Sequence, residues 1–241
     1  MEIVLYTAMT AAEFEKHGSV CSKIAWMACH FSPYGTGLSN LPSSLPENSL
    51  LILNDRTPIC GHDPDLIAKQ LSDTVNSLHC SGILLDFQRP GGESVAAAVA
   101  QLPCNVAVTP PYAQNLDCAV FLPPPPLNML LSDHIAPWKG RPIWQEAALE
   151  RCCFRISAEG SKEIPPSPFP CPHVDKKLHC HYGIDIQPQH IDFYLSRDLQ
   201  QLSAFLAEGA ELEILQFIGL YQQLGSFSSQ ATAQDTARFQ L

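Results

Sequence analysis

Short apolar runs separated by longer amphipathic or polar stretches recur along the chain. The runs with the length of a strand are 2–6, 24–30, 50–54, 82–86, 104–109, 118–122, 142–145, 152–157 and 178–186. Most are apolar throughout rather than alternating, which is typical of strands that are buried on both faces. Because helix-like stretches separate many of these runs, the pattern predicts βα units and a parallel sheet.

Helix start signals lie between several of the predicted strands. Residues 10–13 have the pattern of a capping box, residues 63–64 supply an N-cap followed by proline, and two glycines open the Ala-rich stretch 91–101. Near the end of the chain, segments 199–206 and 214–221 carry apolar residues at helical spacing and predict two further helices. The residues of these two stripes are Leu199, Leu202 and Leu206, and Ile214, Phe217, Ile218 and Tyr221.

The alternation of strands and helices becomes irregular in the second half of the chain. Residues 110–117 are too few for a crossover helix, and the next connection begins with consecutive prolines at 123–126. Eight or nine strands and the lack of a G-x-G-x-x-G motif favour a closed sheet over an open one. We therefore expect an α/β fold, a single (β/α)8 TIM-barrel-like domain over 1–225 whose helices are missing or eroded after strands five and six, followed by a polar C-terminal tail at 226–241.

Composition narrows the classes of partner. The chain has 241 residues, of which 46% are hydrophobic and 16% charged, so it can bury a full core. Its formal net charge is −10 and its 14 basic residues form no cluster, so we expect neither nucleic acid nor a membrane as a partner. No apolar run reaches the ~18 residues of a membrane helix, and no basic segment precedes the first strand. We therefore expect a cytoplasmic protein without signal peptide, whose 10 cysteines are reduced thiols.

Polar and aromatic residues gather where the predicted strands end. In barrel enzymes the active site is built from these strand ends and the loops that follow them. Carboxylates, amides and aromatic rings in one cleft suit a sugar, because rings stack on pyranose faces and planar polar groups bind hydroxyls. The candidate ligand-binding residues are His30, Tyr34, Asn54, Gln88, Arg89, Tyr112, Trp144 and Gln145, and the candidate catalytic residues are Asp86, Glu146 and Asp55.

The fourth predicted strand carries the most informative stretch, residues 81–88 (SGILLDFQ). It resembles the fourth-strand motif D-G-x-D-x-D-x-E of family 18 glycoside hydrolases, the chitinase-like barrels. Gly82 and Asp86 match this motif, whereas Ser81 and Leu84 replace its first two acids and Gln88 replaces its terminal Glu. The resemblance implies a chitinase-like barrel that binds an amino-sugar-containing glycan.

The replacement at position 88 bears directly on catalysis. In the family, the Glu protonates the leaving oxygen while the preceding Asp orients the substrate's own acetamide, which attacks. Gln88 has no proton of suitable acidity, so this chemistry should be impaired, whereas Asp86 could still orient a ligand. Asp55 and Glu146 are candidates for a displaced acid, because two carboxylates about 5–10 Å apart can hydrolyse glycosides by retaining or inverting routes.

A purely structural interpretation of these acids stays open beside the catalytic one. Asp55 could cap a loop or pair with Arg56, Asp86 could pair with Arg89, and Glu146 could begin a helix. A second hypothesis follows, in which the protein is a non-catalytic interaction protein on a barrel scaffold, with its proline-rich loops as the binding surface.

Histidines and cysteines form a second constellation in the last third of the chain. Residues 171–173 (CPH) and 179–181 (HCH), with Asp185, have the residue types of a zinc site. A third hypothesis is therefore a metal-dependent hydrolase that uses the His179/His181 pair. Because no fourth ligand can be assigned, we favour a hydrogen-bonded surface hairpin and expect no metal and no cofactor.

Overall fold

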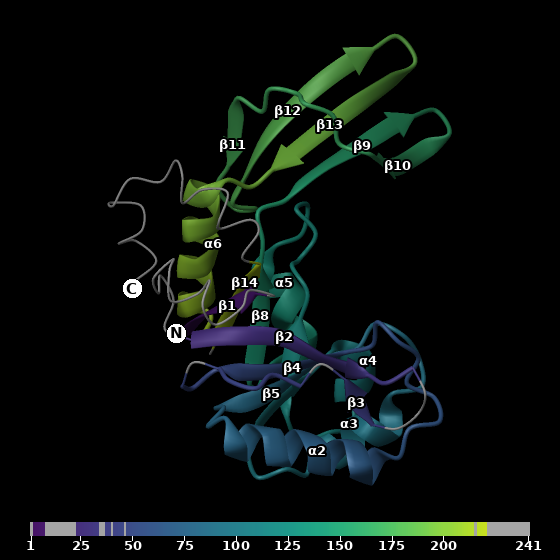
Figure 1. Ribbon diagram of the computed structural model, residues 1–241. Helices are drawn as coiled ribbons and strands as arrows, with labels where there is room; N and C mark the ends of the chain where they lie inside the picture. Colours follow the sequence, from purple (N-terminus) through teal and green to yellow (C-terminus); the bar gives the residue numbers. More distant parts are fainter. Residues whose placement is uncertain are drawn as a thin grey trace. The chain divides into compact units, whose positions relative to one another are not determined.

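The computed structural model describes residues 2–7, 23–33, 37–39, 41–45, 47–214 and 216–220 (Figure 1). The predicted capping box at 10–13 and the tail at 226–241 lie outside these residues. The chain divides into two compact units: residues 1–123, 140–146 and 214–241 form the first, and residues 124–139 and 147–213 form the second. The single-domain organisation of 1–225 stays a prediction.

The first unit contains a nine-stranded sheet in the order β1-β14-β8-β7-β6-β5-β4-β2-β3. Its strands are β1 (Glu2–Thr7), β2 (Lys23–Phe31), β3 (Leu38–Ser39), β4 (Leu50–Asn54), β5 (Gly82–Asp86), β6 (Asn105–Val108), β7 (Ala119–Leu122), β8 (Ile143–Ala147) and β14 (Gln216–Leu220). The pairings from β2 through β4 to β8 are parallel, β1 pairs in parallel with both β14 and β2, and the short β3 is antiparallel to β2. The parallel sheet predicted from the apolar runs is confirmed.

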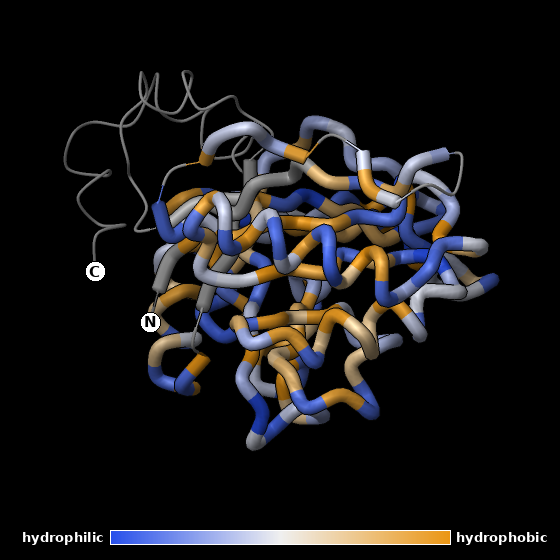
Figure 2. Tube along the Cα trace, turned by 60° about the horizontal axis from the view of Figure 1, so that its bottom comes forward, coloured by the Kyte–Doolittle hydropathy of each residue, from blue (hydrophilic) through white to orange (hydrophobic). Residues whose placement is uncertain are grey.

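The inward residues of this sheet form an apolar core. Most of the strand positions between β4 and β7 are buried, and Figure 2 shows apolar colour along the strands. One core cluster draws on β1 and on β4 to β8: Val4, Leu50, Ile52, Leu84, Ala107, Ala119, Phe121 and Trp144. Leu84, which stands where the family 18 motif has an acid, is fully buried in this cluster, so the replacement serves packing.

Helices of very different length follow the strands. Helix α2 (Pro64–Ser77) begins as predicted, because the Asp63 side chain accepts from the backbone N–H groups of Asp65 and Leu66. Helix α3 (Glu93–Val99) starts after Gly92, and it packs against α2 (Figure 1). The helices after the fifth and sixth strands are only α4 (Pro110–Ala113) and α5 (Leu131–Ile135), the latter followed by the 3₁₀ turn η1 (Ala136–Trp138). The short connections and their prolines account for this erosion.

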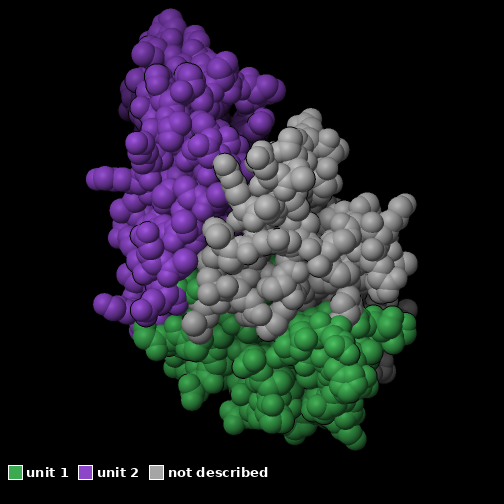
Figure 3. Space-filling model, turned by 90° about the vertical axis from the view of Figure 1, so that its left-hand side faces the viewer, with its two compact units in different colours: residues 1–123, 140–146, 214–241 green, residues 124–139, 147–213 purple. Residues whose placement is uncertain are grey.

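The second unit, shown in purple in Figure 3, contains a five-stranded antiparallel sheet in the order β10-β9-β13-β12-β11. Its strands are β9 (Arg151–Ser157), β10 (Gly160–Ile164), β11 (His173–Asp175), β12 (Cys180–Gln187) and β13 (His190–Ser196). Helix α6 (Leu199–Glu211) follows, with Leu202 and Leu206 buried as its apolar stripe predicts.

Two predictions about the end of the chain are wrong. The runs 152–157 and 178–186 are strands, but they belong to the antiparallel sheet and not to the parallel one. The predicted helix at 214–221 is instead strand β14, which pairs with β1. A short apolar run does not distinguish strand from helix by its periodicity, and here the pairing partner at the opposite end of the chain decides. Among the described residues, no helix combines the length and the apolarity that a bilayer crossing requires.

Candidate functional site

Three polar side chains stand at the carboxyl ends of neighbouring parallel strands. The register pairs His30 on β2 with Asn54 on β4, and Asn54 with Asp86 on β5. Asn54 is buried, whereas His30 and Asp86 are partly exposed. Because adjacent strands lie about 4.8 Å apart, the register puts an imidazole, an amide and a carboxylate in one row.

Asp86 is in direct contact with Gln88. The Gln88 Nε2 donates a hydrogen bond of 2.8 Å to the Asp86 Oδ1, and the Gln88 side chain is exposed to solvent. The residue that replaces the motif's Glu is therefore held by the residue that matches the motif's Asp. The pair offers a ligand an acceptor and an amide, but no acidic proton.

Asp55 anchors the loop that carries Gln88. This carboxylate is only 5% exposed, and its Oδ2 accepts the backbone N–H of Gln88 at 2.7 Å and that of Arg89. Both contacts use Asp55 as an acceptor, which is the role of an ionised carboxylate. The structure thus gives Asp55 the loop-capping role foreseen by the structural interpretation.

Aromatic residues support the same loop from the other side. The Tyr112 hydroxyl donates to the Arg89 carbonyl, and the Tyr112 ring meets Phe87 edge-on at 5.6 Å. Burial raises the pKa of the Tyr112 phenol. Thr109 donates to the Phe87 carbonyl at 2.7 Å, and a Cβ on Gly92 would lie 2.8 Å from the Phe87 ring. Phe87 was not among the predicted site residues. Its burial between the partly exposed Asp86 and the exposed Gln88 is the alternation expected of a strand end, and this pattern could have indicated a supporting role.

The remaining predicted residues lie elsewhere. Trp144 is buried in the core cluster, and Gln145 is fully buried with its Nε2 donating to the carbonyls of Pro123 at 2.9 Å and Glu146 at 3.0 Å. These contacts hold the Gln145 amide nitrogen, whereas its Oε1 is buried without a hydrogen-bond partner among the described residues, and a ligand-binding role for Trp144 and Gln145 stays a prediction. Glu146 is partly exposed and lies in strand β8, not at the start of a helix. Tyr34 lies outside the described residues, and the Arg89 side chain is exposed.

Two histidines of the His/Cys constellation each contact a carboxylate. His179 contacts Glu208 at 2.7 Å and His181 contacts Asp198 at 2.9 Å, while Asp185 accepts from Gln187 at 3.0 Å. Within the part of the chain that the structure describes, no three His, Cys, Asp or Glu side chains are placed to hold a metal ion. The described side chains therefore offer the metal-dependent hydrolase hypothesis at His179/His181 no ligand set, and it stays a prediction, while both histidines are hydrogen-bonded as the hairpin interpretation expects.

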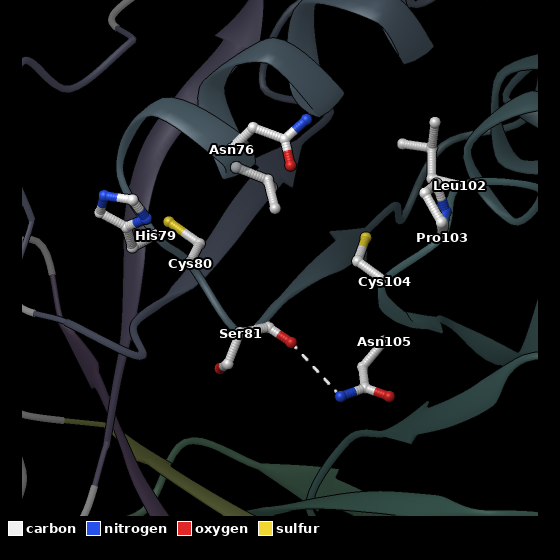
Figure 4. A pocket seen from close by; sticks show the side chains of 9 residues that line it. Asn76, His79, Cys80, Ser81, Leu102, Pro103, Cys104 and Asn105 are labelled. Carbon is white, nitrogen blue, oxygen red and sulfur yellow. Dashed lines mark hydrogen bonds between the residues drawn. The ribbon is translucent and has the colours of Figure 1, made fainter.

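A separate cavity of about 700 Å³ lies at the opposite ends of β5 and β6 (Figure 4). Its lining includes the thiols of Cys80 and Cys104, and Asn105 Nδ2 donates to the Ser81 carbonyl at 3.3 Å. Burial raises the pKa of the Cys80 thiol to about 11, so this thiol stays protonated and unreactive near neutral pH. The cavity is at the amino ends of the strands, away from the row of polar side chains.

Comparisons with solved structures identify the class of fold. The chain is similar to the group IV chitinase of Ostrinia furnacalis, with a TM-score of 0.62 at 7% identity over 99% of this chain and 98% of that one. Human YKL-39, described as a pseudo-chitinase with retained chitooligosaccharide binding properties, gives 0.61 at 8% identity over 99% and 98%. The spore cortex-lytic enzyme SleL of Bacillus megaterium gives 0.57 at 12% identity over 99% and 73%.

The chain therefore has a chitinase-like fold, as the motif at 81–88 implies. Neither a protein-family model nor a curated protein sequence matches it. At identities this low, the likeness establishes the fold alone.

Proposed function

We propose that the protein binds an amino-sugar-containing glycan at the carboxyl ends of its parallel strands and has lost the hydrolytic chemistry of family 18. The observation that carries this proposal is the Asp86–Gln88 hydrogen bond of 2.8 Å. Asp86 occupies the position that orients the acetamide in the family. Gln88 occupies the position of the family's acid and places an amide there, bonded to Asp86.

The proposal includes a closed barrel. The sheet order runs from β2 through β4–β8 to β14 and β1, and β1 also pairs with β2. This order supports an eight-stranded (β/α)8 barrel in which β14 is the eighth strand and the antiparallel sheet is inserted between the seventh and the eighth. In such a barrel His30, Asn54 and Asp86 would stand together at the mouth.

The proposed roles follow from the chemistry of the groups. The Asp86 carboxylate would accept a hydrogen bond from the ligand's acetamide N–H, and a charged acceptor contributes about 1.5–3 kcal/mol. The Gln88 amide would bind a sugar hydroxyl but cannot protonate a glycosidic oxygen. Loss of general acid catalysis lowers the rate by about 10²–10⁴. Asp55 would keep Gln88 in place rather than transfer protons.

The pseudo-chitinase among the similar structures supports binding without turnover, because that protein is described as retaining chitooligosaccharide binding. A displaced acid is the remaining route to catalysis. Of the two candidates, Asp55 already accepts two backbone N–H groups. Asp55 and Glu146 both stay proposed candidates for a carboxylate that would act with Asp86 in an ordinary two-carboxylate mechanism.

The expected setting also follows from the residues. The described cysteines are free thiols, which supports a reducing, cytoplasmic compartment. The scattered basic residues support the expectation that neither nucleic acid nor a membrane is the partner.

Isothermal titration calorimetry with the tetramer of N-acetylglucosamine tests the proposal. We expect binding by the wild-type protein and a loss of affinity of about 10–100-fold in Asp86→Ala, from one charge-assisted hydrogen bond. Asp185→Ala is the matched control, because Asp185 and Gln187 form the same Asp-x-Gln hydrogen bond on β12. Absence of wild-type binding to this tetramer and to peptidoglycan fragments, or equal affinity in Asp86→Ala, would refute the proposed site.

A further inference from the structure

The loop after β5 carries an arginine whose backbone is held on both sides. The Arg89 N–H donates to the Asp55 carboxylate, and the Arg89 carbonyl accepts from the Tyr112 hydroxyl. Asp55 is 5% exposed and Tyr112 is 8% exposed, so both anchors are buried. The Arg89 side chain therefore leaves the chain from a fixed backbone position, directly after Gln88.

The Arg89 guanidinium is in a different environment from its backbone. The side chain is exposed, and within the described ranges no carboxylate lies at ion-pair distance from it. Asp86, which could have paired with it, accepts a hydrogen bond from Gln88 at 2.8 Å. By contrast, Arg155 forms an ion pair with Asp192. Arg89 thus presents its N–H donors to solvent.

The position of this cation relates it to the proposed glycan site. Arg89 follows Asp86 by three residues, so their Cα atoms are at most about 10 Å apart. The long aliphatic stem of an arginine lets the charged end extend well beyond its Cα atom. A sugar held by Asp86, or the sugar bonded to it, therefore comes within reach of the guanidinium.

We infer that Arg89 binds an acidic substituent of the glycan, so that the preferred ligand is an amino sugar that carries a carboxylate. This inference rests on the proposed glycan site and names its substrate class. The planar guanidinium matches the two coplanar oxygens of a carboxylate and can donate to both. A phosphate monoester is a poorer match, because its second negative charge would lie close to the Asp86 carboxylate. N-acetylmuramic acid, with a carboxylate on its lactyl group, is a sugar of the expected class.

The charge of the whole chain makes such a preference informative. The formal net charge is −10, so long-range electrostatics disfavours an anionic ligand. Tighter binding of the acidic sugar therefore has to come from a local cation, and not from the overall field of the protein.

Isothermal titration calorimetry with a matched pair of ligands tests the inference. The first probe is a tetrasaccharide of alternating N-acetylglucosamine and N-acetylmuramic acid, and the second is the same compound with its carboxylates converted to amides. We expect the wild-type protein to bind the acid form about five- to tenfold more tightly than the amide form. This range lies between a solvent-exposed ion pair and a hydrogen bond to a charged group.

Arg89→Gln removes the charge and keeps the backbone contacts of the loop. It should weaken binding of the acid form about five- to tenfold and that of the amide form less than about twofold. Arg151→Gln is the matched control, because Arg151 is also exposed but begins β9 in the second unit. This variant should keep the wild-type preference. Equal urea midpoints of Arg89→Gln and the wild type would establish that the loop is intact.

Equal wild-type affinities for the acid and amide forms would overturn the inference alone, because the glycan site itself would still bind. Equal losses for both forms in Arg89→Gln would also overturn it, since Arg89 would then act on the loop and not on the carboxylate. Tighter binding of an O-sulfated oligomer of N-acetylglucosamine than of the acid form would assign the cation to sulfate instead. Absence of binding to both forms and to the neutral tetramer of N-acetylglucosamine would refute the proposed function, and the inference with it.

Discussion

Asp55 gives the sharpest test of how the loop after β5 is held. Its carboxylate is 5% exposed and accepts the backbone N–H groups of Gln88 and Arg89. Asp55→Ala leaves both donors without this acceptor. Each hydrogen bond to a charged group is worth about 1.5–3 kcal/mol, so we expect a loss of about 3 kcal/mol in the free energy of unfolding, allowing for relaxation of the loop.

Urea unfolding followed by far-UV circular dichroism measures this loss. With a slope of about 2–3 kcal/mol/M, the midpoint should fall by about 1 M. Asp63→Ala is the control, because the Asp63 side chain also accepts two backbone N–H groups but is exposed at a helix N-cap, where the loss is about 1 kcal/mol. Asp55→Asn keeps one acceptor oxygen and should fall between wild type and Asp55→Ala.

The result that would refute this reasoning is a midpoint in Asp55→Ala no lower than that in Asp63→Ala. Asp55 would then not be a positioning group, and its burial would have to serve another purpose, such as the displaced catalytic acid. In that case Asp55→Asn would keep the stability of the wild type and lose any glycosidase activity.

Three further predictions concern backbone packing, an ion pair and an exposed thiol. Gly82→Ala would place a Cβ 2.5 Å from the Asn105 carbonyl, a backbone atom, so the unfolding free energy should fall by about 1–3 kcal/mol; an unchanged urea midpoint would contradict this close approach. Arg155 lowers the pKa of the Asp192 carboxyl, so the pair stabilises the protein above the ordinary carboxyl pKa, and this stability disappears as the pH falls through the lowered value. In the wild type, the urea midpoint should therefore fall as the pH is lowered from about 5 to 2, and Arg155→Met should make this fall smaller. An equal fall in Arg155→Met would show that the Arg155–Asp192 pair does not cause it. Cys60 is the exposed thiol among the described cysteines, so brief alkylation of the native protein should label it before the others, as peptide mass spectrometry would reveal.

The positions of the strands could be predicted well from the sequence, because buried parallel strands leave continuous apolar runs. All seven runs before residue 150 fall on strands of the parallel sheet. Their partners could not be predicted as reliably. The runs at 152–157 and 178–186 have the same composition but pair antiparallel, since the connections and not the strands set direction. The apolar spacing at 214–221 predicts a helix and not strand β14, because the partner strand β1 is more than 200 residues away in the sequence.

The residues of the candidate site likewise divide into those that strand position predicts and those that it does not. Register follows from strand position, so the row of His30, Asn54 and Asp86 could be anticipated. Trp144 and Gln145 lie on β8 and are buried, because Trp144 packs in the core cluster and Gln145 donates to nearby carbonyl groups. The role of Asp55 depended on the path of the loop after β5, which no local pattern encodes.

The most direct test of the central claim is a hydrolysis assay of Gln88→Glu with a fluorogenic oligomer of N-acetylglucosamine. The claim is that Gln88 occupies the place of the family's acid, beside an Asp86 that can still orient the substrate. Gln187→Glu, beside Asp185, is the control for adding a carboxylate to the same type of pair. The account predicts no turnover by the wild type and a gain of about 10²-fold or more over background in Gln88→Glu alone. Turnover by the wild type, or no gain in Gln88→Glu, would contradict it.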